Sequence, residues 1–310
     1  MRRRTILAIA VTLFLARTVM PDDGKASEII RDPHFQRGFT VLAPVSGKRV
    51  VEGVLQWDAV GGKPIWNLAQ WHTKHTIAGA KAERLPSGAV RFSNAAKAVT
   101  VGPAGSEEAD VILAVNASKE YGDHARKKGE GWPHLLVSQR FETHPAIPDL
   151  KEVRFHVSVR LRRSEHHKTD NYTPRLHAAQ FLFFVTIQNL NKQSPGYGDF
   201  LYLGVPLYDD RRRVTRPFAA PDIWGKFIYT PASDVYTTES THDGQWVTID
   251  KDLLPIIHES LKTAWAKGSL KDSHDLSDYR LGGMNIGWEV PGIFDVEMQL
   301  RDLSLRAVAK

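Results

Sequence analysis

The chain has 310 residues, no cysteine and a formal net charge of +6 at pH 7. Four of its arginines lie in the first 17 residues, and without them the net charge is +2. So weak a charge argues against a nucleic-acid partner. The lack of cysteine excludes a disulfide framework, and a chain of this length can bury an adequate core without one.

The N-terminal segment has the pattern of a secretory leader. Arginines at positions 2 to 4 precede an apolar run from Ile6 to Ala16, which is too short to span a bilayer. We therefore expect a signal peptide over residues 1–20, a disordered lead-in over residues 21–31 and a secreted or periplasmic protein. No later segment is long and apolar enough to enter a membrane. After leader removal we expect a monomer that contacts no membrane.

From residue 32 to residue 310 most of the chain has the pattern of short strands separated by turn residues. The expected strands are 50–58, 66–76, 89–92, 98–101, 110–116, 135–141, 152–162, 175–188, 200–206, 226–229, 246–250, 280–289 and 294–306. Helical spacing of apolar residues predicts one amphipathic helix over 251–267, with short helical insertions elsewhere. This pattern predicts a single all-β domain, an antiparallel β-sandwich of the jelly-roll type.

Two central strands carry the clearest polar rows. In residues 153–162 the odd positions are apolar, and the even positions are Arg154, His156, Ser158, Arg160 and Arg162. In residues 176–188 both faces are largely apolar, yet Gln180, Thr186 and Gln188 share one of them. Because side chains alternate between the faces of a strand, we expect these rows to lie together on the concave face of one sheet. Such a face is the usual groove for an extended ligand.

The last strand changes phase. From Phe294 to Leu300 every second residue is apolar, and after Asp302 the apolar set moves by one position. An extra residue at Arg301-Asp302 would produce this change, so we predict a β-bulge there. On the polar face Asp295 and Glu297 lie two residues apart, about 6–7 Å by strand rise.

Three stretches of the chain resemble jelly-roll carbohydrate-active proteins: residues 132–140, 154–188 and 279–295. This class includes concanavalin-like lectins and glucanases, polysaccharide lyases and carbohydrate-binding modules. The paired-glutamate signature of lectin-fold glucanases, Glu-x-Asp-x-x-Glu, is absent, as is a complete alginate-lyase motif set. The resemblance therefore implies a fold and a polysaccharide or oligosaccharide partner, and it assigns no reaction.

The basic central row favours a lyase that cleaves an acidic glycan by β-elimination, because elimination needs a base and cations that neutralise a uronate. The expected catalytic residues are Arg154, His156, His177, Gln180 and Tyr202. The expected substrate-binding residues are Arg160, Gln188, Trp132, Trp224 and Glu297. The two tryptophans are candidate platforms for sugar rings, since Trp132 and Trp224 both stand in loop-like contexts.

Three alternatives remain open. A glycoside hydrolase would need two carboxylates, for which Asp295 and Glu297 are candidates with Glu289 nearby. A non-catalytic carbohydrate-binding protein would need only the platforms, and in an adhesion or structural protein the polar rows would merely face solvent.

We expect no cofactor and no metal site. The two His-rich motifs, His72-x-x-His75 and Glu165-His166-His167-x-x-Asp170, lack an established zinc spacing and are interpreted as solvent-exposed loops. A structural calcium is common in such sandwiches, but no pattern in the sequence assigns its ligands.

Overall fold

The computed structural model describes residues 26–57, 62–122 and 124–310. The predicted signal peptide and the first part of the predicted lead-in lie outside the described residues. Among the described residues no helix combines the length and apolar character needed to cross a membrane.

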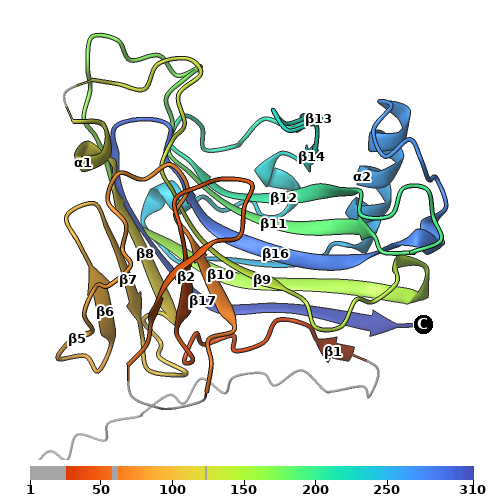
Figure 1. Ribbon diagram of the computed structural model, residues 1–310, viewed down its shortest axis with the longest axis horizontal. Helices are drawn as coiled ribbons and strands as arrows, with labels where there is room; N and C mark the ends of the chain where they lie inside the picture. The colour runs from red at the N-terminus through yellow and green to blue at the C-terminus, as the bar shows by residue number, and fades with distance from the viewer. Residues whose placement is uncertain (1–25, 58–61, 123) are drawn as a thin grey trace, which may run out of the picture.

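Two large β-sheets pack face to face (Figure 1). The eight-stranded sheet has the order β15-β10-β17-β8-β7-β6-β5, with β1 beside β17. Its strands are β1 (Ala26–Glu28), β5 (Glu83–Arg84), β6 (Val90–Ser93), β7 (Lys97–Val101), β8 (Val111–Asn116), β10 (Leu150–His166), β15 (Val247–Asp252) and β17 (Phe294–Ala309).

The nine-stranded sheet has the order β13-β14-β12-β11-β16-β9-β4-β2-β3. Its strands are β2 (Phe39–Leu42), β3 (Val51–Leu55), β4 (Trp66–Ala69), β9 (His134–Arg140), β11 (Gln180–Asn189), β12 (Phe200–Asp209), β13 (Phe218–Pro221), β14 (Phe227–Thr230) and β16 (Tyr279–Glu289). All pairs are antiparallel except β2–β4 and β12–β14. The predicted all-β sandwich is confirmed.

Alternating apolar residues build the core between the sheets. On β10 the side chains of Val153, Phe155, Val157 and Val159 are fully buried, and on β11 so are Phe181, Phe183, Val185 and Ile187. The Phe155 and Phe183 rings stack across the interface with centroids 4.2 Å apart. An aromatic pair of this kind adds about 0.5–1.5 kcal/mol beyond the area that it buries.

The main helix, α2 (Leu254–Ala266), packs against β10 and β12. It is shorter than predicted at its N-terminus because β15 continues to Asp252, which pairs with Arg154. The carboxylate of Asp252 then accepts a hydrogen bond of 2.9 Å from the Leu254 amide, which satisfies one of the free donors at the helix start. The remaining helices are α1 (Ala117–Tyr121) and four short 3₁₀ turns, η1 (Ile147–Asp149), η2 (Ser233–Val235), η3 (Thr241–Asp243) and η4 (Leu276–Asp278).

The two ends of the described domain lie side by side, because β1 pairs with the end of β17 at Val308 and Arg306. Ile29 and Ile30 are only 3% and 2% exposed. The prediction of a disordered lead-in is therefore wrong from residue 26 onward, since this segment completes a sheet and buries apolar side chains.

The predicted bulge in the closing strand is confirmed. Between the pairs His156↔Ser304 and Ser158↔Arg301, β17 contains one residue more than β10. Asp302 has a positive φ of 57°, and its amide donates a 2.8 Å hydrogen bond to the carboxylate of Asp110. The bulge lets Leu300 and Leu303 both point into the core, where they are 0% and 1% exposed.

Candidate functional site on the nine-stranded sheet

The predicted central polar rows lie on opposite sides of the molecule. β10 and β11 are consecutive in the chain but belong to different sheets, and their apolar faces meet through Phe155 and Phe183. Because the faces of a strand alternate, Arg154 points outward from the eight-stranded sheet and Gln180 points outward from the nine-stranded sheet. The expectation of one groove containing both residues is therefore wrong.

The basic residues of β10 lie on the outer surface of the eight-stranded sheet, where they contact neighbouring elements. Arg154 is hydrogen-bonded to Asp250 of the neighbouring β15, and the Nδ1 atom of His156 lies 3.9 Å from the same carboxylate. Arg160 donates from Nε to the carbonyl of Gly244 at 3.0 Å. Three of the predicted catalytic or binding residues thus join β10 to β15 and the adjacent turn.

His177 and Glu297 also lie outside any shared groove. His177 is 1% exposed: its Nδ1 accepts from the Thr173 amide at 2.9 Å and its Nε2 donates to the Arg126 carbonyl at 2.8 Å. Both ring nitrogens are therefore used in holding two loops together, which contradicts a catalytic role. Glu297 lies on the outer face of β17, because its neighbours on either side, Val296 and Met298, point into the core.

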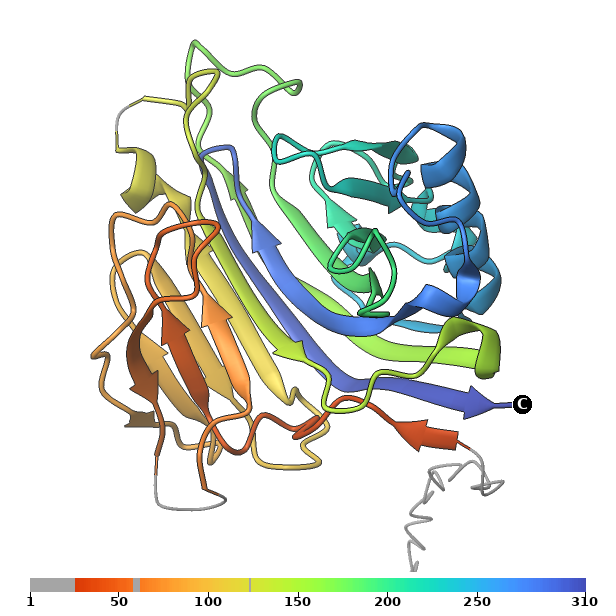
Figure 2. The same ribbon diagram turned by 45° about the vertical axis from the view of Figure 1, so that its right-hand side comes forward.

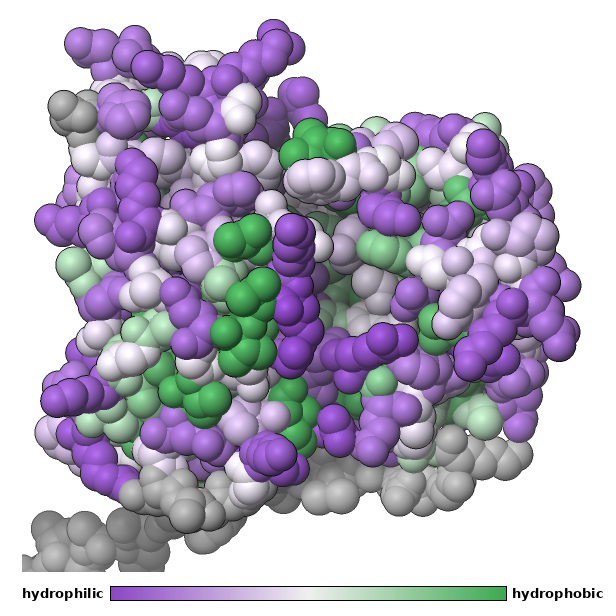
Figure 3. Space-filling view, in the orientation of Figure 1, coloured by the Kyte–Doolittle hydropathy of each residue, from purple (hydrophilic) through white to green (hydrophobic). Residues whose placement is uncertain are grey.

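The nine-stranded sheet presents a hollowed outer surface, which we call the concave face. Figure 2 shows its long strands bending, and Figure 3 shows the surface hollowed over β11, β12 and β16. Of the residues predicted for the site, Gln180 and Gln188 of β11 and Tyr202 of β12 lie on this face. Trp224 stands at its edge, in the turn between β13 and β14, with 69% of its surface exposed.

Glycines of β16 shape the floor of the concave face. A side chain at Gly287 would strike the carbonyl of Leu135 on β9 at 2.2 Å, and Gly287 has a φ of +151°. A side chain at Gly282 would meet Thr186 and Gln188 at 2.8 Å. Glycine at position 287 therefore lets β16 approach the backbone of β9 closely, and glycine at position 282 leaves the polar ends of Thr186 and Gln188 uncovered.

A cluster of one carboxylate, one imidazole and two indoles lies at one end of this floor. Glu289 ends β16, and its Oε2 accepts from Trp132 Nε1 at 3.3 Å and lies 3.6 Å from His134 Nε2. The His134 ring is stacked on Trp132, with centroids 5.5 Å apart, and meets Trp71 edge-on at 5.4 Å. Register explains the assembly, because Glu289 pairs directly with His134 of β9 and with Gln180 of β11.

The cluster controls the charge of Glu289. Burial alone would raise the pKa of this carboxyl, but His134 and Trp132 outweigh burial and hold the pKa below its usual value. Glu289 is therefore an anion at neutral pH. His134 donates from Nδ1 to the Trp132 carbonyl at 2.8 Å, so its Nε2 is the ring nitrogen that faces Glu289.

A second carboxylate lies across Gln180 from Glu289. The Gln180 amide donates a hydrogen bond to Asp209 Oδ2 at 2.9 Å. Arg211 donates two more to the same carboxylate, from Nε at 2.7 Å and from Nη2 at 2.5 Å. Two strand spacings place the backbones of Glu289 and Asp209 about 9–10 Å apart. The Asp209 side chain is only 6% exposed and is neutralised by Arg211.

A separate cavity of about 660 Å³ opens at the ends of β10 and β12. Its lining includes Arg162, Arg163, Tyr172, Tyr208, Asp210 and His242. Burial raises the pKa of Asp210 to about 6 and that of Tyr208 to about 12. Sequence patterns did not identify this cavity, because its walls come from strand ends and loops that are distant in sequence.

Of the cluster residues, Trp132 was predicted as a platform and Glu289 was noted as a nearby acid. Trp71 was not chosen among the predicted binding residues, and His134 was missed. The signal that the sequence carried for His134 and Glu289 was their position at the ends of strands. His134 begins a strand directly after Trp132-Pro133, and Glu289 ends a glycine-rich strand. Neither position reveals that β9 and β16 are neighbours.

No family model and no curated protein matches the chain. Solved structures do align with it. An endoglucanase from Rhodothermus marinus is 13% identical with a TM-score of 0.39, over 74% of this chain and 97% of that one. A family 12 xyloglucanase from Bacillus licheniformis is 8% identical with a TM-score of 0.42, over 77% of this chain and 99% of that one.

A family 11 xylanase from Neocallimastix patriciarum is 10% identical with a TM-score of 0.37, over 74% of this chain and 96% of that one. What the chain itself does has to be inferred from its own residues.

Proposed function

We propose that this protein binds a polysaccharide across the concave face of the nine-stranded sheet and hydrolyses it beside Glu289. The observation that carries the proposal is the Glu289 carboxylate, held as an anion between His134 and Trp132 in the hollowed surface. The side chain of Glu289 remains 23% exposed, so a ligand lying on the face can reach it.

Carbohydrate is the ligand class that these side chains suit. Indole rings such as Trp132 and Trp71 pack against the apolar faces of sugar rings, and planar amides such as Gln180 and Gln188 hydrogen-bond the hydroxyls. The exposed Trp224 at the β13–β14 turn supplies a further ring at the border of the face. The surface is long enough to hold an extended chain because it crosses several strands.

Hydrolysis fits the concave face better than elimination. The predicted lyase depended on Arg154 and His156, and these residues lie on the other sheet. A hydrolysis step at Glu289 balances: Glu289 takes a proton from the attacking water as the oxygen of that water bonds to the anomeric carbon. The bond to the departing sugar oxygen breaks, and that oxygen takes its proton from solvent water. The oxygen of the attacking water then stands on the anomeric carbon in place of the departed sugar.

A second candidate function is binding without cleavage. It is favoured by the Asp209–Arg211 ion pair, because a hydrolase usually needs two working carboxylates and Arg211 neutralises the second one. As expected from the sequence, we also propose that the protein is secreted or periplasmic, monomeric and independent of a cofactor.

A panel of neutral and acidic polysaccharides tests the proposal. New reducing ends without unsaturated products support hydrolysis, and new reducing ends with unsaturated uronates would instead support elimination. Retention on a glycan without products supports the binding function. Absence of retention and of products on every glycan would contradict both candidates.

A further inference from the structure

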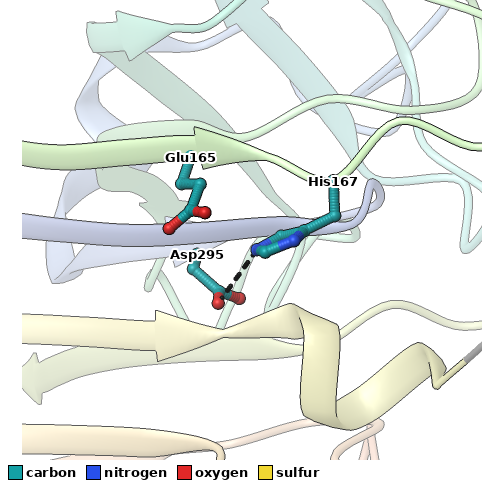
Figure 4. Close-up of side chains that lie close together, drawn as sticks. All are labelled: Glu165, His167 and Asp295. Atoms are coloured by element: carbon teal, nitrogen blue, oxygen red, sulfur yellow. Dashed lines mark hydrogen bonds and ion pairs between the residues drawn. The ribbon is translucent and has the colours of Figure 1, made fainter.

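On the outer face of the eight-stranded sheet, two carboxylates and an imidazole converge. Figure 4 shows Glu165 near the end of β10, His167 just after it and Asp295 at the start of β17. Each offers one ligand atom, and these atoms lie within 4.8 Å of one another. From this arrangement we propose a binding site for a divalent transition-metal ion, with Zn²⁺ as the representative ion.

The local electrostatics favour a cation here. Glu165 and Asp295 are directly paired across β10 and β17, and like charges in that position repel. The Glu165 side chain has no hydrogen bond or ion pair with any other described residue, and His167 Nε2 lies 3.1 Å from Asp295 Oδ2. A cation bound among the three would remove the repulsion and give Glu165 a partner.

Hydrogen bonds to neighbouring residues already hold two of the three ligand residues in position. Asp295 accepts hydrogen bonds from the Ser118 amide at 3.1 Å and the Ser118 hydroxyl at 2.9 Å, and its side chain is only 12% exposed. Such outer contacts fix a carboxylate for metal binding. His167 is anchored by its amide, which donates to the Ile293 carbonyl at 2.9 Å.

The geometry and the donor set select the class of ion. Zinc ligands lie about 2.0–2.2 Å from the metal and, in a tetrahedral site, about 3.3–3.6 Å from one another. The three atoms lie within 4.8 Å of one another, so a rotamer adjustment that shortens the longest separation by about 1.2–1.5 Å completes the site. An imidazole with two carboxylates suits transition metals, whereas calcium prefers oxygen ligands alone. With three protein ligands the ion would keep positions for water.

The spacing of the motif could not have revealed this set. The predicted solvent-exposed motif contains Glu165 and His167, but the third ligand, Asp295, lies 128 residues after His167. The site is independent of the proposed hydrolysis, since it lies on the opposite sheet from Glu289.

Titration calorimetry of chelator-treated protein with Zn²⁺ tests the site. We expect one ion per chain, and we expect Glu165→Gln and His167→Gln each to weaken binding at least about tenfold, because loss of even an outer contact typically costs 10–100-fold. Ser118→Ala should weaken binding about tenfold for the same reason. Glu165 and His167 are exposed or half-buried, so these variants should fold.

Two variants on the same outer face serve as matched controls: Glu297→Gln on β17 and His156→Gln on β10. Both should bind Zn²⁺ like the original chain. Zn²⁺ should also raise the Tm of the original chain and the controls, and not that of the two ligand variants. The proposal is wrong if the double variant Glu165→Gln/His167→Gln binds Zn²⁺ as tightly as the original chain, or if Ca²⁺ binds more tightly than Zn²⁺.

Discussion

Phe155 and Phe183 stack across the core of the sandwich, with ring centroids 4.2 Å apart and an interplanar angle of 28°. The contact joins two strands that follow one another in the chain but lie in different sheets. It therefore turns their polar faces to opposite sides of the molecule. One side carries the concave face with Glu289, and the other carries the triad of Glu165, His167 and Asp295.

Replacing Phe183 with alanine should lower the free energy of unfolding by about 3–5 kcal/mol, because the fully buried ring leaves a cavity between the sheets. Urea denaturation measures the loss. Phe200→Ala on the outward face of β12 is the control, since Phe200 is only half-buried. An equal loss in both variants would contradict the assigned orientation of the strand faces.

Lys97 of β7 and Glu120 of α1 form a buried ion pair at 2.9 Å, with side chains 0% and 3% exposed. Lys97→Met should destabilise the fold by about 3–5 kcal/mol, because it leaves the buried Glu120 carboxylate without a countercharge, held only by the Thr73 hydroxyl and the Lys74 amide. The double variant Lys97→Met/Glu120→Gln should recover part of that loss. If the double variant is less stable than Lys97→Met in urea denaturation, the unpaired charge is not the cause.

Asp210 should make stability depend on pH in the mildly acidic range. Its pKa is about 6 in the fold, raised by burial from 3.8, so the folded state holds a proton that the unfolded state releases. Its contribution is full below about pH 4 and is lost as the pH rises through about 6, by up to about 3 kcal/mol. Urea denaturation of Asp210→Asn should show no such loss, and a parallel pH dependence in both proteins would rule the explanation out.

Trp132 should tune the chemistry of Glu289 as well as support the ligand. Trp132→Phe keeps an aromatic ring but removes the Nε1 donor, one of the contacts that lower the pKa of Glu289. The acid limb of the pH–rate profile should therefore move to higher pH, with little change in KM. Trp132→Ala should also weaken glycan binding about tenfold, as loss of about 1.4 kcal/mol of ring contact implies.

Trp265→Phe on α2 is the control for both substitutions of Trp132, because Trp265 packs against Tyr279 and His274 and not on the concave face. Its pH profile and its KM should equal those of the original chain. An unchanged acid limb in Trp132→Phe would mean that the indole donor does not act on the catalytic group.

Local patterns in the sequence predict the longer strands, because these strands show alternation within one strand. The short strands β1, β2, β5 and β13 were not predicted, and the expected strand 66–76 is observed only as β4 (Trp66–Ala69). The bulge at Asp302 also follows from a local pattern, since the change of phase between Leu300 and Leu303 is visible in the chain itself. The helix was also predictable, apart from its first residues. Residues 251 and 252 belong to β15 instead, because Asp252 pairs with Arg154.

The candidate site depends on which strands pair with one another in each sheet, and alternation within a single strand does not give this pairing. Polar rows on β10 and β11 look alike in sequence, and only the assignment of each strand to a sheet separates Arg154 from Gln180. Likewise, Glu289 and His134 meet because β16 pairs with β9, although the two strands are distant in the chain. Long-range pairing therefore set the limit of what could be predicted.

The most direct test of the central proposal is the hydrolysis rate of Glu289→Gln on the polysaccharide that the original chain cleaves. The variant Glu297→Gln, on the outer face of the opposite sheet, controls for the loss of a carboxylate elsewhere and should cleave at the original rate. We predict that Glu289→Gln keeps glycan binding and loses cleavage at least about a hundredfold, as removal of a general base typically costs. Cleavage at the original rate by Glu289→Gln would contradict a catalytic role for the concave face.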